Sequence, residues 1–452
     1  MPNAIDRTRL RELMERELAR FEAEHPRSRE LFEGAKANLL AGVPMPWMSE
    51  WAGPYPVFVA EAHGARFTDV DGHGYVDLCL GDTGAMTGHA PKEAVEAIAE
   101  QAARGITHML PTEDAAWVGA EMERRFGLPF WQFCLTATDA NRFTIRLARA
   151  ITGRPKILVF NYCYHGSVDE TILTIEDGVA GPRPGNIGPP VNPTQTTRVV
   201  EFNDVDALEE ALAPEDVACV LAEPALTNIG IVLPDPGYHD ALRTLTREHG
   251  TCLVIDETHT ICTGPGGATG AWGLEPDFVT IGKPLASGVP AACYGMSADV
   301  AERTDAFMHA LPTTDVGGIG GTLSGNALSL AAMRATLEHV LTGPAFERMI
   351  ALGERWAGGV KTAIDQHALP WEVQRLGCRA EYWFTPTPPR SGGEAAAADD
   401  HELASFTHLY ALNRGILLTP FHNMALMSPA TTDADVDAHT AVFDEMAVEL
   451  TR

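Results

Sequence analysis

The sequence predicts an α/β fold with a parallel sheet in the middle of the chain, and three observations lead to that prediction. Four short apolar runs alternate with helical patterns between residues 156 and 282: "KILVF", "ACVLAEP", "TCLVIDE" and "FVTIG". Continuous apolar runs between helices are typical of parallel strands that are buried on both faces. The chain has 452 residues, 45% of them hydrophobic, which indicates two domains, interleaved in sequence or consecutive. After about residue 325 the pattern changes to shorter strands between long helices.

The segments before the sheet come in the order helix, hairpin, helix. Residues 7–22 place apolar side chains at helical spacing among many charges, which predicts an amphipathic helix. Residues 57–78 alternate apolar and polar side chains around the turn "DGHG", which predicts a hairpin. Residues 90–105, "APKEAVEAIAEQAARG", predict a second helix.

The segments after the sheet predict a smaller set of strands and helices. A long helix is expected over residues 326–341, and a final helix over residues 433–450. Short strands are expected in "RAEYWFTP" and "GILLTP". The stretch between the two strands, residues 386–400, is rich in proline, glycine and alanine and is expected to be a flexible loop.

Composition excludes several classes of partner. The formal net charge of -28 argues against nucleic acid and anionic membranes, and no apolar run reaches the length of a membrane span. None of the eight cysteines forms a CxxC pair, so no metal site is expected, and buried free thiols fit a reducing cytoplasm. The charged N-terminal segment has no apolar core of a secretory signal, which also favours a cytoplasmic location.

Two residues with chemical potential follow apolar strands directly. Asp256 ends the run "LVID", and Lys283 comes one glycine after "FVTI". In open parallel sheets the ligand site lies at the carboxyl ends of the strands, where a desolvated lysine can become a neutral amine and form a Schiff base. A helix cap or a solvated loop is an equal alternative for Asp256 alone, and a surface lysine is the favoured alternative for Lys283 alone.

Two further segments carry candidate cofactor-binding groups, and one of them lies where an apolar run ends. In "LTATDANRF", residues 135–143, small and hydroxyl side chains precede a helix, and the free N–H groups of such a helix start can bind an anion. An ordinary cap by Thr136 or Thr138 explains the same pattern, and both interpretations can hold together. In "NYCYHGS", Tyr164 could stack on a cofactor beside His165, or it could be a buried tyrosine next to a capping histidine.

Taken together, these segments resemble the class III aminotransferases, especially their glutamate-1-semialdehyde aminomutase-like branch. "IDETHT" and "DFVTIGKPLASGVPAACYG" are similar to the aspartate–glutamate and lysine motifs, and Asp256 precedes Lys283 by 27 residues, as in the family. "LTATDANRFTIRLARAITGR", "NYCYHG", "LAEPALTNIG" and "GGTLSGNALSLAA" also match in order. The resemblance runs from about Val43 to the C-terminus, and an ordered set of motifs is far more specific than any one of them.

The resemblance implies a pyridoxal 5'-phosphate (PLP) enzyme of fold type I. Residues 76–325 would form the large domain with a mostly parallel sheet, and residues 1–75 and 326–452 the small α+β domain. Lys283 would be the Schiff-base lysine, and Asp256 would pair with the pyridine nitrogen so that the ring acts as an electron sink. The other implied cofactor residues are Ala137 and Thr138 at the phosphate, Tyr164 stacked on the ring, His165, Glu223, Asn228 and Thr258 around it, and Thr322 at the phosphate of the partner subunit in a homodimer.

Departures from the family pattern concern the substrate more than the cofactor. Ala137 stands where the phosphate loop usually has glycine, and Thr258 where an apolar β-branched residue is usual. Met48 stands where the branch has an arginine for the substrate carboxylate, and Asp82 replaces a tryptophan. Met48 lies in an aromatic and apolar segment with Trp47, so an apolar pocket for aromatic or bulky amines is expected. Arg142 and Arg379 are the candidate cations for a substrate carboxylate, although a solvated or structurally paired arginine is the more frequent case for each.

The sequence therefore predicts a PLP-dependent aminotransferase that moves an amino group between an amine or amino acid and a carbonyl acceptor. An aminomutase or racemase that uses the same residues is the alternative. A PLP-binding protein without catalytic activity is a remote alternative, because such a protein need not keep both Lys283 and Asp256.

Overall fold

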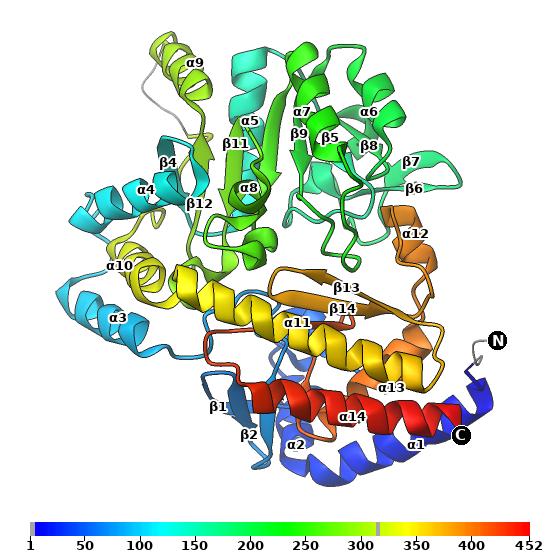
Figure 1. Ribbon diagram of the computed structural model, residues 1–452. Helices are drawn as coiled ribbons and strands as arrows, with labels where there is room; N and C mark the ends of the chain where they lie inside the picture. Colours follow the sequence, from blue (N-terminus) through cyan, green and yellow to red (C-terminus); the bar gives the residue numbers. More distant parts are fainter. Residues whose placement is uncertain (1–4, 313–316) are drawn as a thin grey trace. The chain divides into compact units, whose positions relative to one another are not determined.

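The computed structural model describes residues 5–312 and 317–452, and the chain divides into two compact units (Figure 1). The terminal unit consists of Met1–Pro91, Glu347–Pro388 and Ala398–Arg452, and the central unit of Lys92–Phe346 and Pro389–Ala397. Residues 76–91 thus lie in the terminal unit and residues 326–346 in the central unit, on the other side of the divisions expected at residues 75 and 325. Each unit is described below by itself.

The central unit is built on a seven-stranded sheet with the order β4-β12-β11-β10-β9-β5-β8. Its strands are β4 (Phe130–Cys134), β5 (Lys156–Phe160), β8 (Thr197–Val200), β9 (Val217–Ala222), β10 (Cys252–Asp256), β11 (Phe278–Ile281) and β12 (Ala292–Met296). Strands β8, β5, β9, β10 and β11 are mutually parallel, whereas β12 is antiparallel to both of its neighbours. The four apolar runs are therefore β5, β9, β10 and β11, and the expectation of an α/β fold with a mostly parallel sheet is confirmed.

Helices cover the sheet because its central strands are buried on both faces. Every residue of β9, β10 and β11 is buried. The helix α5 (Ala137–Thr152) packs on β9, β11 and β12, and its buried side chains recur at helical spacing. The helices α6 (Val205–Leu212) and α7 (Tyr238–Glu248) pack on β8 and β10, respectively. This unit also contains α3 (Lys92–Arg104), α4 (Glu113–Phe126), β6 (Leu173–Glu176), β7 (Val179–Pro182), α8 (Gly267–Trp272) and α9 (Ala298–His309).

The helix expected over residues 326–341 is shorter and changes its winding. It consists of α10 (Ala327–Ala335) followed by a π-helical turn over Thr336–Val340. The buried guanidinium of Arg125 donates hydrogen bonds to the carbonyl oxygens of Leu337 and Leu341, at 2.7 and 3.0 Å. These bonds satisfy the carbonyl groups that the end of the helix leaves open.

The prediction of a flexible loop over residues 386–400 is wrong for the middle part of this segment. This part contains the short helix α12 (Gly392–Ala397) and packs within the central unit. A Cβ atom at Gly392 would come within 2.1 Å of the carbonyl oxygen of Asn161, and the amide of Gly393 donates to Glu201 at 3.2 Å. The two glycines therefore allow this segment to pack closely against Asn161 and Glu201. Composition alone predicts flexibility for the same glycines.

The terminal unit is α+β and combines both ends of the chain. One sheet has the order β1-β2-β3-β15 and a second the order β13-β14-β16. The strands are β1 (Val59–His63), β2 (Arg66–Asp69), β3 (Gly74–Asp77), β13 (Glu372–Leu376), β14 (Arg379–Trp383), β15 (Ile416–Leu417) and β16 (Met424–Leu426). The helices are α1 (Arg7–Glu24), α2 (Pro26–Ala35), α11 (Gly343–Gln366), α13 (His401–Leu412) and α14 (Asp433–Thr451). The expected hairpin is β1–β2–β3, and its strands pair antiparallel.

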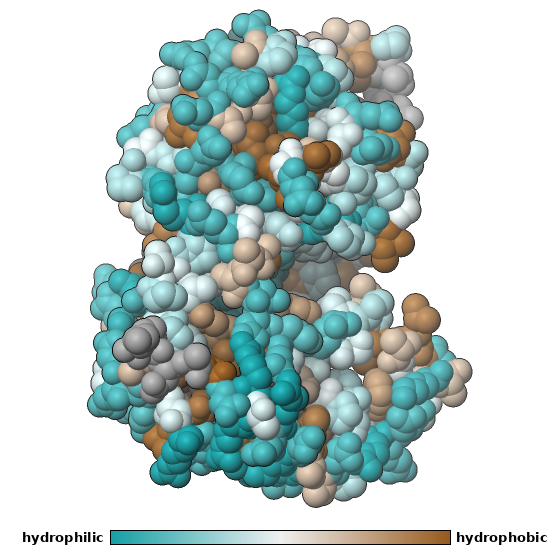
Figure 2. All heavy atoms as spheres, turned by 90° about the vertical axis from the view of Figure 1, so that its right-hand side faces the viewer, coloured by the Kyte–Doolittle hydropathy of each residue, from teal (hydrophilic) through white to brown (hydrophobic). Residues whose placement is uncertain are grey.

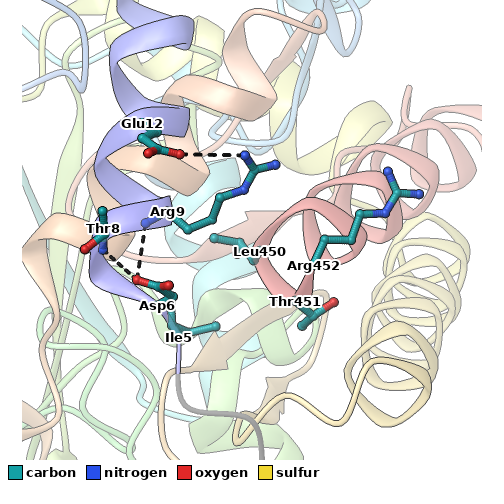
Figure 3. Close-up of a pocket in the computed structure, with 8 residues that line it drawn as sticks. All are labelled: Ile5, Asp6, Thr8, Arg9, Glu12, Leu450, Thr451 and Arg452. Atoms are coloured by element: carbon teal, nitrogen blue, oxygen red, sulfur yellow. Dashed lines mark hydrogen bonds and ion pairs between the residues drawn. The ribbon is translucent and has the colours of Figure 1, made fainter.

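The first and last helices lie side by side in the terminal unit. Together they line a cavity of about 410 Å³, between the start of α1 and the end of α14 (Figure 3). The side chain of Asp6 caps α1 by accepting hydrogen bonds from the amides of Thr8 and Arg9. Nε of Arg9 donates to the carbonyl oxygen of Glu449 at 3.5 Å, so the two helices are also joined directly.

The face of the molecule shown in Figure 2 is mainly hydrophilic. On the face shown in Figure 2, apolar residues form small groups between larger hydrophilic areas. Among the described residues, no helix has both the length and the apolar character needed to cross a lipid bilayer.

Candidate active site

The carboxyl edge of the central sheet brings together the two residues that follow apolar strands. Asp256 at the end of β10 lies opposite Thr280 in the parallel register with β11, and Lys283 follows three residues later. Lys283 has a φ angle of 50°, and it begins a short 3-10 helix, Lys283–Ala286. A non-glycine residue in this left-handed region is uncommon, and such conformations often occur at functional sites.

Asp256 is buried, and three groups hold its carboxylate. Oδ2 accepts hydrogen bonds from Nδ1 of His165 at 2.9 Å and from the side-chain amide of Asn141 at 2.8 Å, while Oδ1 accepts from the backbone amide of Thr258 at 3.0 Å. Burial alone would raise the pKa of Asp256, but the hydrogen bonds from His165, Thr258 and Asn141 and the charge of His165 lower it below its ordinary value. Asp256 is therefore an anion at neutral pH.

His165 is the imidazole partner of this carboxylate. Burial disfavours the imidazolium, but Cys163 and Asp256 together raise the pKa of His165 well above its ordinary value. Nδ1 carries a proton because it faces the carboxylate. Since the ring is fully buried, its position is fixed by this ion pair and by the packing around it.

The amine of Lys283 contacts a histidine that the sequence analysis did not single out. Nζ of Lys283 lies 2.6 Å from Nε2 of His259, and the imidazole is buried. Two positive charges at this separation would repel by about 6 kcal/mol even at an effective dielectric constant of 20. At this separation a proton can pass directly between the two nitrogens.

The first residues of α5 lie beside this edge of the sheet. Thr136 is the cap, because its hydroxyl accepts from the amide of Asp139, so the capping interpretation is confirmed. The helix then begins at Ala137, where a Cβ atom on Gly282 would lie 3.1 Å from the backbone nitrogen. A Cβ atom on Gly166 would overlap the hydroxyl of Thr138 at 2.0 Å. Only glycine fits at Gly166, so the segment after Tyr164 lies directly against Thr138 at the helix start.

The other expected cofactor residues lie near the ends of β5 and β9 or in loops of the central unit. Tyr164 has 41% of its surface exposed, and its amide donates to Glu223 at 3.4 Å. Glu223 is fully buried and also accepts a hydrogen bond from Thr227, and burial raises its pKa. Asn228 is half-buried. Thr258 is buried beside Asp256, and Thr322 is exposed in a loop that contains several glycines.

Two of the expected substrate residues pair with each other, and the other three have separate contacts. Asp82 and Arg379, which the sequence suggested for different reasons, form an ion pair at 3.8 Å within the terminal unit, and Arg379 is fully buried. Trp47 is exposed and meets the ring of Phe421 edge-on.

The two remaining candidates have other contacts. Met48 packs against the core cluster of the terminal unit that includes Phe21 and Tyr55. Arg142 lies at an exposed position and donates to the carbonyl oxygen of Ser167 at 2.7 Å.

Sequence reasoning missed the buried amide that joins the parts of this site. Asn141 donates to Asp256 and to the carbonyl oxygen of His165, and it accepts from the hydroxyl of Thr280 at 2.7 Å. The only available signal was a polar residue on the apolar face of α5. In the same way, His259 stands three residues after Asp256 in the quoted motif, but its contact with Lys283 depends on how the chain turns after β10.

A comparison with protein-family models identifies the family of this chain. The model of the class III aminotransferases matches residues 47–445. The chain belongs to this family. The expected family is thereby confirmed, and with it an enzyme of the PLP-dependent class III kind.

Curated relatives extend the comparison over most of the chain. Glutamate-1-semialdehyde 2,1-aminomutase of Desulfitobacterium hafniense is 34% identical over 418 residues, which cover 91% of this chain and 95% of the relative. The enzyme of the same name from Sorangium cellulosum is 35% identical over 428 residues, covering 93% and 96%, respectively.

Solved structures show the same fold. A glutamate-1-semialdehyde-aminomutase from Pseudomonas aeruginosa PAO1 has a TM-score of 0.97 and 50% identity, and the match covers 99% of this chain and 100% of that one. A lysine-to-alanine variant of that protein has been solved in complex with PMP. An omega-transaminase from Sphaerobacter thermophilus has a TM-score of 0.84 and 27% identity, with coverage of 94% and 97%. The expected fold type I is confirmed.

PLP is the cofactor of this family, and the chemistry of the described residues fits it. Lys283 offers an amine at a strand end, and Asp256 is a buried anion at the neighbouring strand end. The start of α5 presents free N–H groups, and a Cβ atom at Gly166 or Gly282 would crowd it. A cationic ring, an aldehyde and a phosphate each find a complementary group in this set.

Proposed function

We propose that this protein is a PLP-dependent aminomutase, which moves an amino group between adjacent carbons of one small substrate. The observation that carries the proposal is the 50% identity over 99% of the chain with a glutamate-1-semialdehyde-aminomutase, combined with the intact pair of Lys283 and Asp256. By the name of these relatives, the substrate is glutamate-1-semialdehyde and the amino group moves from carbon 2 to carbon 1.

In this proposal Lys283 holds the cofactor and later acts on the substrate. PLP, when bound, supplies an aldehyde that takes up amines and a ring that accepts electrons from the substrate carbon. Asp256 keeps a positive charge on the ring nitrogen, and Asn141 and His165 keep Asp256 ionised. Ala137 and Thr138 bind the phosphate, while Tyr164, Glu223, Asn228 and Thr258 surround the ring.

His259 is assigned to proton transfer at Nζ of Lys283. When its amine is free, Lys283 would be the base whose Nζ takes the proton from the substrate carbon. The 2.6 Å contact lets His259 accept a proton from Nζ, so the amine becomes neutral again without exchange with solvent. An aminomutase benefits from such a pair, because it must remove and return a proton at two adjacent carbons.

The position of Met48 favours a second candidate function. An aminotransferase for an aromatic or bulky amine would place an apolar group beside Trp47 and Met48, where the family pattern has a carboxylate-binding arginine. This candidate has less support than the aminomutase, because the relatives with 34%, 35% and 50% identity described above are named aminomutases. In either case a substrate carboxylate needs another cation, and Arg379 with Asp82, or Arg142, is the available choice.

A substrate assay distinguishes the two candidates. The holoenzyme is expected to convert glutamate-1-semialdehyde into the isomer with its amino group on carbon 1, in the absence of any added amine or carbonyl acceptor, as followed by mass spectrometry and NMR. If Arg379 binds the substrate carboxylate, Arg379→Gln should cost about 1.5–3 kcal/mol in kcat/KM. The same substitution at Arg142 is the comparison. Turnover of an aromatic amine with a keto acid, without isomerisation of the semialdehyde, would instead support the aminotransferase.

We also propose a homodimer in which Thr322 reaches the phosphate site of the partner subunit. Thr322 is exposed, and Gly320 and Gly321 precede it with φ angles of 153° and 137°, so the loop can approach another backbone closely. Sedimentation of the holoenzyme is expected to give a dimer, and Thr322→Val is expected to weaken retention of the cofactor about tenfold. A fully active monomer would contradict this part of the proposal.

The cytoplasm is the proposed location. All eight cysteines are free and buried, which agrees with a reducing compartment.

A further inference from the structure

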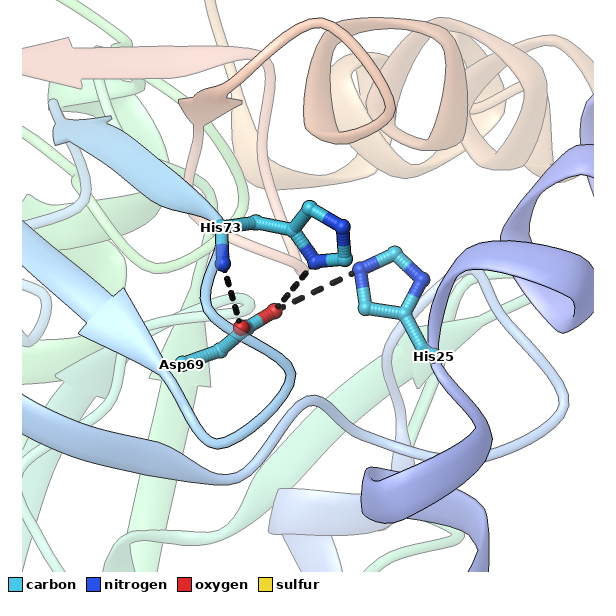
Figure 4. A group of neighbouring side chains, drawn as sticks. All are labelled: His25, Asp69 and His73. Atoms are coloured by element: carbon cyan, nitrogen blue, oxygen red, sulfur yellow. Dashed lines mark hydrogen bonds and ion pairs between the residues drawn. The ribbon is translucent and has the colours of Figure 1, made fainter.

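Two histidines and one aspartate converge in the terminal unit, at residues the proposed reaction does not use. His25 lies between α1 and α2, Asp69 ends β2, and His73 lies in the turn before β3 (Figure 4). Nε2 of His25, Nδ1 of His73 and a carboxylate oxygen of Asp69 all lie within 4.8 Å of one another. His25 and Asp69 are buried, whereas the side chain of His73 is 40% exposed.

Two of the three separations match those between the ligands of a tetrahedral metal ion, while the third, between the two histidine nitrogens, is at most 4.8 Å. Oδ2 of Asp69 lies 3.5 Å from Nε2 of His25 and 3.2 Å from Nδ1 of His73. Nitrogen and oxygen ligands lie about 2.0–2.2 Å from zinc, so two ligands at a tetrahedral angle are roughly 3.3–3.5 Å apart. The largest adjustment falls on the partly exposed His73.

Two of the three ligands are already oriented by their other atoms. Nδ1 of His25 lies 2.8 Å from the carbonyl oxygen of Phe21, which can only accept, so Nδ1 carries the proton and Nε2 presents a lone pair. Oδ1 of Asp69 accepts from the amides of Asp71 and His73 at 2.9 and 2.8 Å, whereas Oδ2 accepts from the hydroxyl of Tyr75 at 2.8 Å and is hydrogen-bonded to Nδ1 of His73 at 3.2 Å. Metal-binding histidines and carboxylates are typically held by such outer hydrogen bonds.

The existing hydrogen bonds leave one acceptor without a hydrogen atom when His25 is neutral. The hydroxyl of Tyr75 lies 2.8 Å from both Oδ2 of Asp69 and Nε2 of His25, but it has only one hydrogen to donate. When Tyr75 donates to Asp69, the lone pair of His25 faces an oxygen. A cation between the three side chains gives this lone pair a partner.

We propose that His25, Asp69 and His73 bind one divalent transition metal ion of the zinc type. The ion joins the connection between α1 and α2 to the hairpin of β2 and β3. It enters past the exposed side chain of His73, and a water molecule completes the coordination. Binding requires the Tyr75 hydroxyl to leave Nε2 while it keeps its hydrogen bond to Asp69. CxxC patterns could not reveal this site, because its ligands come from two separate segments.

Cobalt binding to the metal-stripped holoenzyme tests the proposal. Co²⁺ is expected to bind with one equivalent per chain, to give the intense visible absorption of a tetrahedral site, and to be displaced by Zn²⁺. His73→Ala removes the exposed ligand with little effect on folding, and it is expected to weaken binding at least about tenfold. His63→Ala is the matched control, since His63 is an exposed histidine of the same unit that lies outside the cluster.

Thermal unfolding gives a second measurement. Zn²⁺ is expected to raise the Tm of the wild type and of His63→Ala, and to leave that of His73→Ala almost unchanged, because an ion that binds only the folded chain stabilises it. Asp69→Asn, if it folds, should bind Co²⁺ less tightly as well. A wild type that takes up no Co²⁺, or a His73→Ala variant that binds it as tightly as the wild type, would overturn the proposal.

Discussion

Replacing Lys283 with alanine is expected to lower turnover by about three to four orders of magnitude, because one change removes both the covalent attachment of the cofactor and the base at the substrate carbon. The fold should survive, since Lys283 follows β11 rather than forming part of it. Reduction of the wild-type holoenzyme with borohydride should fix the cofactor on the peptide that contains Lys283. Circular dichroism and steady-state kinetics then separate loss of function from loss of structure.

A conservative change at the neighbouring histidine serves as the comparison. His259→Gln keeps a polar group near Nζ of Lys283 but cannot take up a proton at neutral pH. It is expected to lower kcat about tenfold, with little change in KM and with the borohydride label still on Lys283. Full kcat in this variant would remove His259 from the proposed mechanism. A label on another lysine, or full turnover by Lys283→Ala, would refute the role of Lys283 itself.

Asp256→Asn is expected to lower turnover by about two to three orders of magnitude while the protein still binds the cofactor. The carboxylate is ionised because His165, Thr258 and Asn141 outweigh the effect of burial on its pKa. A neutral amide in its place cannot hold a positive charge on the ring nitrogen, so proton removal from the substrate carbon becomes slow. The rate of that step can be measured directly by loss of deuterium from the labelled substrate.

The adjacent carboxylic acid provides a matched control. Glu257 is also buried, but burial raises its pKa, and it accepts hydrogen bonds from Thr260 and Thr269 and from the amide of Ala268 near the start of α8. Glu257→Gln should therefore reduce the free energy of unfolding and leave the turnover of folded molecules nearly unchanged. If both variants lose turnover equally, the effect at Asp256 is structural and its assigned role is wrong.

Much of the central unit could be predicted from the sequence, because its signals are local. Apolar runs such as "KILVF" and "CLVI" can be buried on both faces only in a covered parallel sheet, and the structure contains them as β5 and β10. Predictions were weaker where contacts between residues far apart in the sequence determine the local structure. Arg125 binds the carbonyl groups at the end of the expected long helix, and Asn161 receives Gly392 from a segment that looks flexible by composition.

In the candidate site, too, residues with a local sequence signal could be predicted, whereas residues placed by long-range contacts could not. Asp256 and Lys283 could be predicted because each follows its own strand, and parallel strands end at one edge. Asn141 could not, because its three hydrogen bonds reach residues from three different segments. The contact of His259 with Lys283 also depends on tertiary structure, as does the pairing of Asp82 with Arg379. Periodicity places a residue on a face of an element, but it does not identify the atom that the residue meets.

The pairing of β3 with β15 has a consequence for synthesis on the ribosome. Val76 pairs with Ile416, so the strand that completes this edge of the first sheet emerges only after most of the protein has been made. Until then a nascent chain carries the hairpin with an open edge, while in the central unit each strand from β8 to β12 has an earlier strand to pair with as it emerges, and only β4 waits for β12. The order of translation thus differs from the order of assembly, and the terminal unit is the part whose maturation has to await the release of the chain.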